Sequence, residues 1–117
     1  MEADMTTVTI GLSSVGESKA RMQGAFRGEP QGAFISFATL ELLWKALTPK
    51  RWQILQVMTG AGPLAIRDVA RRVERDVKPV HGDVHALLEA GVLDRTEDGR
   101  VAFPYDEVHV DFTVRAA

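Results

Sequence analysis

Apolar residues between 48 and 103 recur at spacings that predict three short amphipathic helices followed by a hairpin. The first helix is expected to begin at Thr48-Pro49, because a hydroxyl caps free amides and proline suits the first helical position. Gly60-Ala61-Gly62-Pro63 ends it, and a second helix is expected from about Ala65. The apolar faces of these two helices comprise Trp52, Ile54, Leu55, Met58, Ile66, Val69, Ala70 and Val73.

The third helix is expected over roughly Val77 to Ala90, with Asp76 as its N-cap. Its apolar stripe comprises Val80, Val84, Leu87 and Leu88. Two short strands, Val92 to Thr96 and Arg100 to Phe103, then flank Asp98-Gly99, and such a pair between apolar-rich strands is a strong hairpin signal.

The order helix, helix, helix, β-ribbon is the ground plan of a winged helix-turn-helix. In that fold the third helix enters the major groove of DNA with its N-terminal residues nearest the bases, while the second helix crosses the backbone. The expected DNA-binding residues are the cations and histidines of the second helix, third helix and hairpin, namely Arg71, Arg72, Arg75, Lys78, His81, His85, Arg95 and Arg100. Asp83 is expected to pair with an arginine of the preceding helices.

The flanks of this unit alternate between apolar and polar residues, which predicts half-buried strands at 7–12 and 107–114. Because a lone pair of strands is marginal in water, they are expected to pair with each other, with the copies of a partner subunit, or with both. Ser14-x-x-Glu17 is a capping-box pattern and predicts a helix over about 15–26, followed by a linker at 28–32.

A further helix is expected over about Phe37 to Leu47, following Ser36. Its apolar residues spread over most of its circumference, so most of its surface must be buried against other parts of the protein. A second subunit is the simplest source of that contact. The expected dimer interface comprises Phe37, Leu40, Leu43, Trp44, Leu47, Val110 and Phe112. The fold expected is therefore α+β: an N-terminal strand-helix extension over 1–35 for dimerisation or partner binding, then a winged helix-turn-helix domain with a C-terminal strand over 36–117.

Composition fits one small cytoplasmic domain. The chain has 117 residues, of which 45% are hydrophobic, and it has no cysteine, which suits a reducing compartment. It has no apolar run long enough for a membrane span and no secretory signal. The net charge is −2, yet residues 66–78 hold five basic and three acidic residues, a local charge of +2. Modest, strongly salt-dependent binding to double-stranded DNA is expected.

The sequence contains few of the residue patterns that indicate a catalytic or a metal site. His81 and His85 are spaced i, i+4 and could form one edge of a metal site, but only His109 and scattered carboxylates remain as further ligands. No metal site and no cofactor is therefore expected, although a ligand- or metal-responsive sensor stays an alternative. No nucleophile triad, phosphate loop or H-E-x-x-H motif is present, so an enzyme is not expected.

The run TPKRWQILQVMTGAGPLAIRDVARRVERDVKPVHGDVHALLEAGVLDRTEDGRVAFP, from Thr48 to Pro104, resembles the MarR-like winged-helix predicted transcriptional regulators of bacteria and archaea. Its most specific parts are IRDVA at 66–70 and LLEAGVL at 87–93. Where such proteins often carry a basic residue on the third helix, this chain has Gly82.

The resemblance and the helix pattern together predict a homodimeric DNA-binding transcriptional regulator, most simply a repressor that occludes a promoter. Some similar proteins are taken to be antitoxins, which leaves a second function open: neutralising a small toxin by protein contact while autoregulating the operon. The sequence does not choose between activator and repressor.

Overall fold

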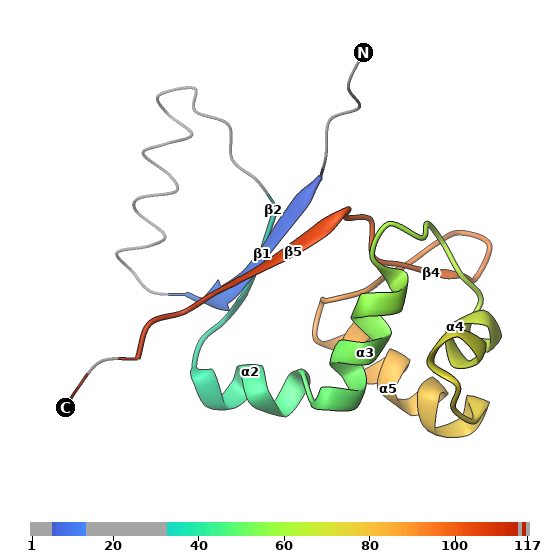
Figure 1. The fold of residues 1–117 in the computed structure, drawn as a ribbon, viewed down its shortest axis with the longest axis horizontal. Helices are drawn as coiled ribbons and strands as arrows, with labels where there is room; N and C mark the ends of the chain where they lie inside the picture. Colours follow the sequence, from blue (N-terminus) through green and yellow to red (C-terminus); the bar gives the residue numbers. More distant parts are fainter. Residues whose placement is uncertain (1–5, 14–32, 115, 117) are drawn as a thin grey trace, which may run out of the picture.

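The computed structural model describes residues 6–13, 33–114 and 116, and its architecture is α+β (Figure 1). The elements in chain order are β1 (Thr7–Leu12), β2 (Ala33–Phe37), α2 (Leu40–Ala46), α3 (Pro49–Met58), α4 (Ile66–Val73), α5 (Val77–Glu89), β3 (Asp94–Arg95), β4 (Val101–Ala102) and β5 (Glu107–Asp111). Strands β1, β2 and β5 form one sheet, and α2 leads from it to the other three helices (Figure 1). The helix expected over 15–26 and the linker at 28–32 lie outside the described residues.

Helices α3, α4 and α5 lie where the apolar pattern predicted them. The hydroxyl of Thr48 accepts a hydrogen bond from the backbone N–H of Arg51 at 3.3 Å, which caps α3 as expected. At the other end of the unit, Gly91 has φ +78° and ends α5. The prediction for Asp76 was right in position but wrong in mechanism, because Asp76 occupies the N-cap of α5 while its carboxylate makes no capping hydrogen bond.

The hairpin is shorter than predicted. Strands β3 and β4 have two residues each and pair antiparallel, with Arg95 opposite Val101. The tip turns at Gly99, where φ is +84°. The segment before α4 also joins the hairpin: the backbone of Leu64 exchanges two hydrogen bonds with that of Val101, each 2.9 Å long. These bonds fix the hairpin against the start of α4.

The three-stranded sheet is parallel, with β1 in the centre between β2 and β5. The strands expected at the two ends of the chain do pair with each other, and Thr7 lies opposite Glu107. The register places Val8 and Ile10 on the same face as Val108 and Val110. This apolar face turns toward the helices, since Val8 and Ile10 are fully buried in the core they share.

Strand β2 was not predicted, and the helix expected over 37–47 was placed three residues too early. Phe37 is the last residue of β2, where it lies opposite Leu12 of β1. Helix α2 begins at Leu40, because the hydroxyl of Thr39 caps it by accepting from the backbone N–H of Leu42 at 3.1 Å. The domain boundary expected at 35/36 therefore falls within β2, and the sheet joins both of the expected parts.

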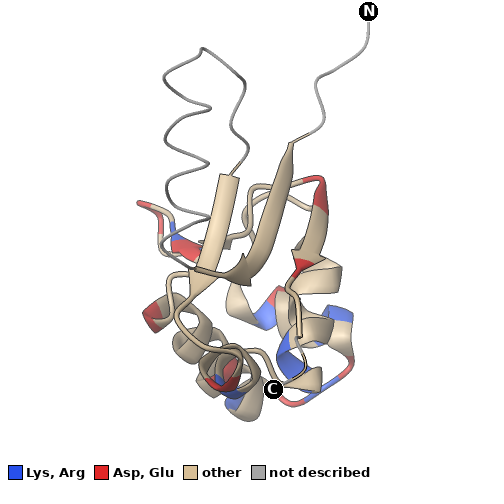
Figure 2. Cartoon of the chain, turned by 90° about the vertical axis from the view of Figure 1, so that its left-hand side faces the viewer, with Lys and Arg blue, Asp and Glu red and all other residues tan. Residues whose placement is uncertain are grey.

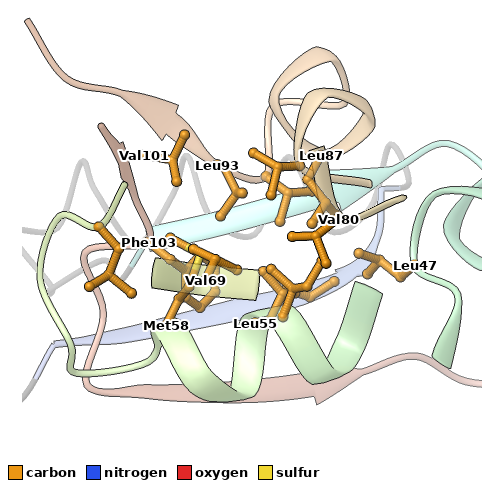
Figure 3. Close-up of a cluster of buried hydrophobic side chains, with 14 of the residues drawn as sticks. Leu47, Leu55, Met58, Val69, Val80, Leu87, Leu93, Val101 and Phe103 are labelled. Atoms are coloured by element: carbon orange, nitrogen blue, oxygen red, sulfur yellow. The ribbon is translucent and has the colours of Figure 1, made fainter. Parts of the chain in front are cut away.

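The core is one cluster of apolar side chains from every layer of the fold. In Figure 3 side chains of α3, α4 and α5 meet those of the hairpin region. Fully buried members include Leu47, Leu55, Met58, Val69, Val80, Val84, Leu87, Val101 and Phe103. The predicted apolar stripes of the three helices supply eight of the 17 buried residues that the structure describes in this cluster. None of the helices in the described part of the chain has the length and apolar character needed to cross a bilayer.

Candidate functional site

Asp83 organises the inner side of α5. Its carboxylate accepts hydrogen bonds from Nε of Arg51 at 3.1 Å and from Nη2 of Arg75 at 2.9 Å. The three side chains are 16–22% exposed, so these ion pairs are largely shielded from solvent. Burial alone raises the pKa of Asp83, but the hydrogen bonds and charges of Arg75 and Arg51 outweigh it and hold the pKa below its ordinary value. The expected pairing of Asp83 with arginines of the preceding elements is confirmed.

The same network links α5 to three other elements. Arg51, on α3, also donates from Nη1 to the backbone carbonyls of Lys45 and Ala46 at the end of α2. Arg75 comes from the short turn between α4 and α5. The turn itself is tight, because Glu74 has φ 56° and its N–H bonds back to α4. The network thus fixes the orientation of α5 relative to α2, α3 and α4.

Arg75 was expected to contact DNA, but its side chain lies against the inner side of α5. Its side chain is 16% exposed and is held by Asp83. Among the described residues Nη1 of Arg75 meets no hydrogen-bond acceptor, so the guanidinium depends on Asp83 for its compensation. Arg75 therefore positions α5 and is not a free surface cation.

The outer side of α5 is open. Lys78, His81 and Gly82 are exposed, and a Cβ built on Gly82 would meet nothing within 4 Å. A surface hollow of about 470 Å³ lies beside this side of the helix. It is lined by residues of α4, α5 and the hairpin tip, namely Ala65, Ile66, Arg67, Asp68, Arg71, Val77, His81 and Gly99.

The cations that line this hollow come from α4. Arg71 and Arg72 are exposed on α4, and Arg71 pairs with Asp68 one turn away at 3.0 Å. Arg67, also exposed, lines the hollow and was missed by the sequence reasoning. Its signal was available, because a residue four positions before Arg71 shares a helix face with it. Figure 2 shows Lys and Arg in the helical part and the hairpin region, whereas β1, β2 and β5 carry none.

At the hairpin, Arg95 and Arg100 are both exposed, but Arg100 is partly neutralised. Its Nε lies 3.0 Å from a carboxylate oxygen of Asp98, and the hydroxyl of Thr96 donates to the same carboxyl group. The hydrogen bond from Thr96 and the nearby Arg100 hold the pKa of Asp98 below its ordinary value. Arg100 is therefore oriented along the tip of the hairpin.

The two histidines of α5 lie side by side. The Nε2 atoms of His81 and His85 are 3.2 Å apart, and the ring centroids are 4.2 Å apart. His81 is exposed and His85 is half-buried. No group of three or more His, Cys, Asp or Glu side chains suited to a metal occurs among the residues that the structure describes.

The residues expected at a dimer interface differ in their exposure. Leu43 and Leu47 were wrongly assigned, because both are buried in the core of their own chain. Trp44 is 53% exposed and Val110 is 43% exposed, and Trp44 contacts Phe112 edge to face with centroids 6.1 Å apart. The remaining two, Phe37 and Leu40, are half-buried. Trp44, Val110 and the half-buried Phe112 are called the α2–β5 patch below.

Comparison with known proteins identifies a family for the helical part of the chain. Residues 46–110, which span α3, α4, α5 and the hairpin, match the HVO_A0114 family. A search of curated proteins gave no match. The match covers more than half of the 117 residues, and the chain belongs to the HVO_A0114 family.

Proposed function

We propose that this member of the HVO_A0114 family binds double-stranded DNA as a MarR-like winged helix-turn-helix regulator of transcription. Helix α5 would lie in the major groove, α4 across the backbone, and the β3–β4 hairpin would act as the wing. The observation that carries the proposal is the open outer side of α5, flanked by α4 and the hairpin tip around one hollow. A helix that reads DNA needs such an uncovered side.

Two further features support this arrangement. The backbone pairing of Leu64 with Val101 is a single β-bridge that ties the hairpin to the segment before α4, as a wing requires. Asp83, an unfavourable residue for a surface that approaches phosphates, is turned inward and neutralised by Arg51 and Arg75. The charge of Asp83 is thereby directed away from the side that would meet DNA.

The cations available for phosphate contacts are Arg67, Arg71, Arg72, Lys78 and Arg95, with Arg100 in part. With three or four contacts per subunit, the logarithm of affinity would fall by about 3 to 4 per unit of log salt concentration. Binding is then measured by fluorescence anisotropy on a random-sequence duplex of about 25 base pairs, long enough for two half-sites.

The variant Arg67→Ala/Lys78→Ala removes one cation from α4 and one from α5. We expect it to weaken binding and to reduce the salt slope by about 2, because each lost phosphate contact removes about 0.9. Lys45→Ala, an exposed change on α2, is the matched control and leaves both quantities unchanged. An unaltered slope in the double variant, or an equal effect of Lys45→Ala, would remove this surface from the proposal.

We further propose that the protein acts as a homodimer joined through the α2–β5 patch, so that two wings meet two half-sites and occlude a promoter. The patch holds exposed apolar side chains that water solvates poorly, with Trp44 and Phe112 in contact. Sedimentation of the full chain should give twice the chain mass, and Trp44→Glu should give the monomer. Val77→Ser, an exposed apolar change on α5, is the control that keeps the dimer.

The same patch favours a second candidate function, the neutralisation of a small toxin by contact. In that case the isolated chain is monomeric in sedimentation, and a toxin encoded beside its gene co-purifies with it. Trp44→Glu should then release the toxin, whereas Val77→Ser should retain it.

A further inference from the structure

The histidine pair on α5 has the geometry of a chelating site. His81 and His85 are one helical turn apart, so their side chains project from the same face. Their Nε2 atoms converge to 3.2 Å. A metal-bound imidazole nitrogen lies about 2.0–2.1 Å from Zn²⁺, so two nitrogens on a tetrahedral ion are about 3.3–3.4 Å apart. At right angles on the same ion the two nitrogens would be about 2.9 Å apart. The observed separation falls between these two arrangements.

We propose that the Nε2 atoms of His81 and His85 together bind one late first-row transition-metal cation, with Cu²⁺ preferred over Ni²⁺ and Zn²⁺. Imidazole nitrogen suits these three ions, and Cu²⁺ stands at the top of the affinity order for nitrogen sites. Mg²⁺ and Ca²⁺ are excluded because they require oxygen ligands. The contact between the two rings needs little rearrangement. The imidazole that carries its proton on Nε2 takes the tautomer with the proton on Nδ1, which leaves both Nε2 lone pairs free for the cation.

The rest of the coordination sphere is open to solvent or to an external ligand. The carboxylate nearest along the helix, Asp83, is held by Arg51 and Arg75 and points away from the outer side. No third His, Cys, Asp or Glu completes a cluster within the described parts of the chain. Gly82, between the histidines, adds no side chain, so the ion would remain accessible. The site is thus a bidentate chelate of two histidines on the exposed side of α5.

The chain offers a matched control for a test. It has three histidines and no cysteine, and the third histidine, His109, is exposed on β5 away from α5. Untagged full-length protein is titrated with Cu²⁺, Ni²⁺, Zn²⁺ and Mg²⁺ by calorimetry in a buffer that does not chelate metals. His81→Gln, His85→Gln and His109→Gln are compared, because Gln is a good helix former and keeps a polar side chain.

We expect one Cu²⁺, Ni²⁺ or Zn²⁺ per chain and no Mg²⁺. His81→Gln or His85→Gln should weaken binding by about 100-fold, since the second imidazole of a chelate binds intramolecularly, whereas His109→Gln should bind like the parent. As a second readout on the unaltered protein, paramagnetic Ni²⁺ should broaden the NMR signals of the His81 and His85 rings and spare His109. Equal binding in all three variants, or broadening that spares α5, would overturn the assignment. Because the titration contains no DNA, its outcome is independent of the proposed function.

Discussion

Removing the carboxylate of Asp83 is expected to cost more stability than any comparable change at an exposed ion pair. In Asp83→Asn the two guanidinium groups of Arg51 and Arg75 stay close together without the charge that compensates them. Breaking a fully buried pair costs about 3–5 kcal/mol, and an exposed pair contributes about 0–1 kcal/mol. The three side chains are 16–22% exposed, so we expect Asp83→Asn to lower the free energy of unfolding by about 2–3 kcal/mol.

The matched control is Asp68→Asn, which removes a pair of nearly the same length on the surface. Arg71 and Asp68 are 3.0 Å apart, but their side chains are 73% and 41% exposed. We expect this change to cost less than about 0.5 kcal/mol because solvent screens the pair. Distance alone predicts similar losses for the two variants, and burial predicts different ones.

The assays are equilibrium unfolding in urea, which adds no ionic screening, and thermal melts, both at neutral pH and followed by tryptophan fluorescence and circular dichroism. For a domain of this size the melting temperature of Asp83→Asn should fall by about 6–10 °C. A third variant, Arg51→Met/Asp83→Leu/Arg75→Met, should recover most of the loss, since apolar replacement of a complete buried ion group is often neutral. Equal free energies for Asp83→Asn and Asp68→Asn would refute the claim that burial gives this network its strength.

Four further outcomes are expected. Because the folded-state pKa of Asp83 is lowered from 3.8, its contribution is complete above about pH 5 and is lost as pH falls below 3.8, so unfolding curves of the parent and Asp83→Asn should converge in acid. In thermal melts, Gly11→Ala should destabilise the sheet by more than about 2 kcal/mol, since its Cβ would collide with the backbone carbonyl of Asp111. Gly82→Ala should instead stabilise α5 by about 0.5–1 kcal/mol, because its Cβ meets nothing and alanine favours a helix. Thr48→Ala should cost about 1 kcal/mol by removing the cap of α3, measured in the same denaturant series.

The helical core was predictable because its signals are local. The stripe Val80, Val84 and Leu87 repeats at helical spacing within one segment, and all three side chains are fully buried as expected. Thr48-Pro49 likewise marks the start of α3 with residues that contact only their own first turn. Such signals can be read from a short segment of the sequence without knowing which distant residues it contacts.

The errors concern residues whose environment is set by distant segments. Phe37 suits an apolar helix face as well as a strand, and only its pairing with β1 decides between them. Arg75 looks like a surface cation in the sequence, and its burial depends on Arg51 and Asp83 meeting at the same point. Leu43 is covered by its own chain because α2 packs on the sheet, a contact that no periodicity reveals.

The central position of β1 has a consequence for how the chain matures. Its partner Glu107 lies 100 residues downstream of Thr7, so one edge of β1 stays unpaired until residue 107 has left the ribosome. Contacts so distant in sequence form late, while the helices and the hairpin can assemble from local contacts. In a nascent or truncated chain that stops before residue 107, β1 would have an unpaired edge and its apolar residues Val8 and Ile10 would lose part of their cover. Such a species is prone to be recognised by chaperones and proteases.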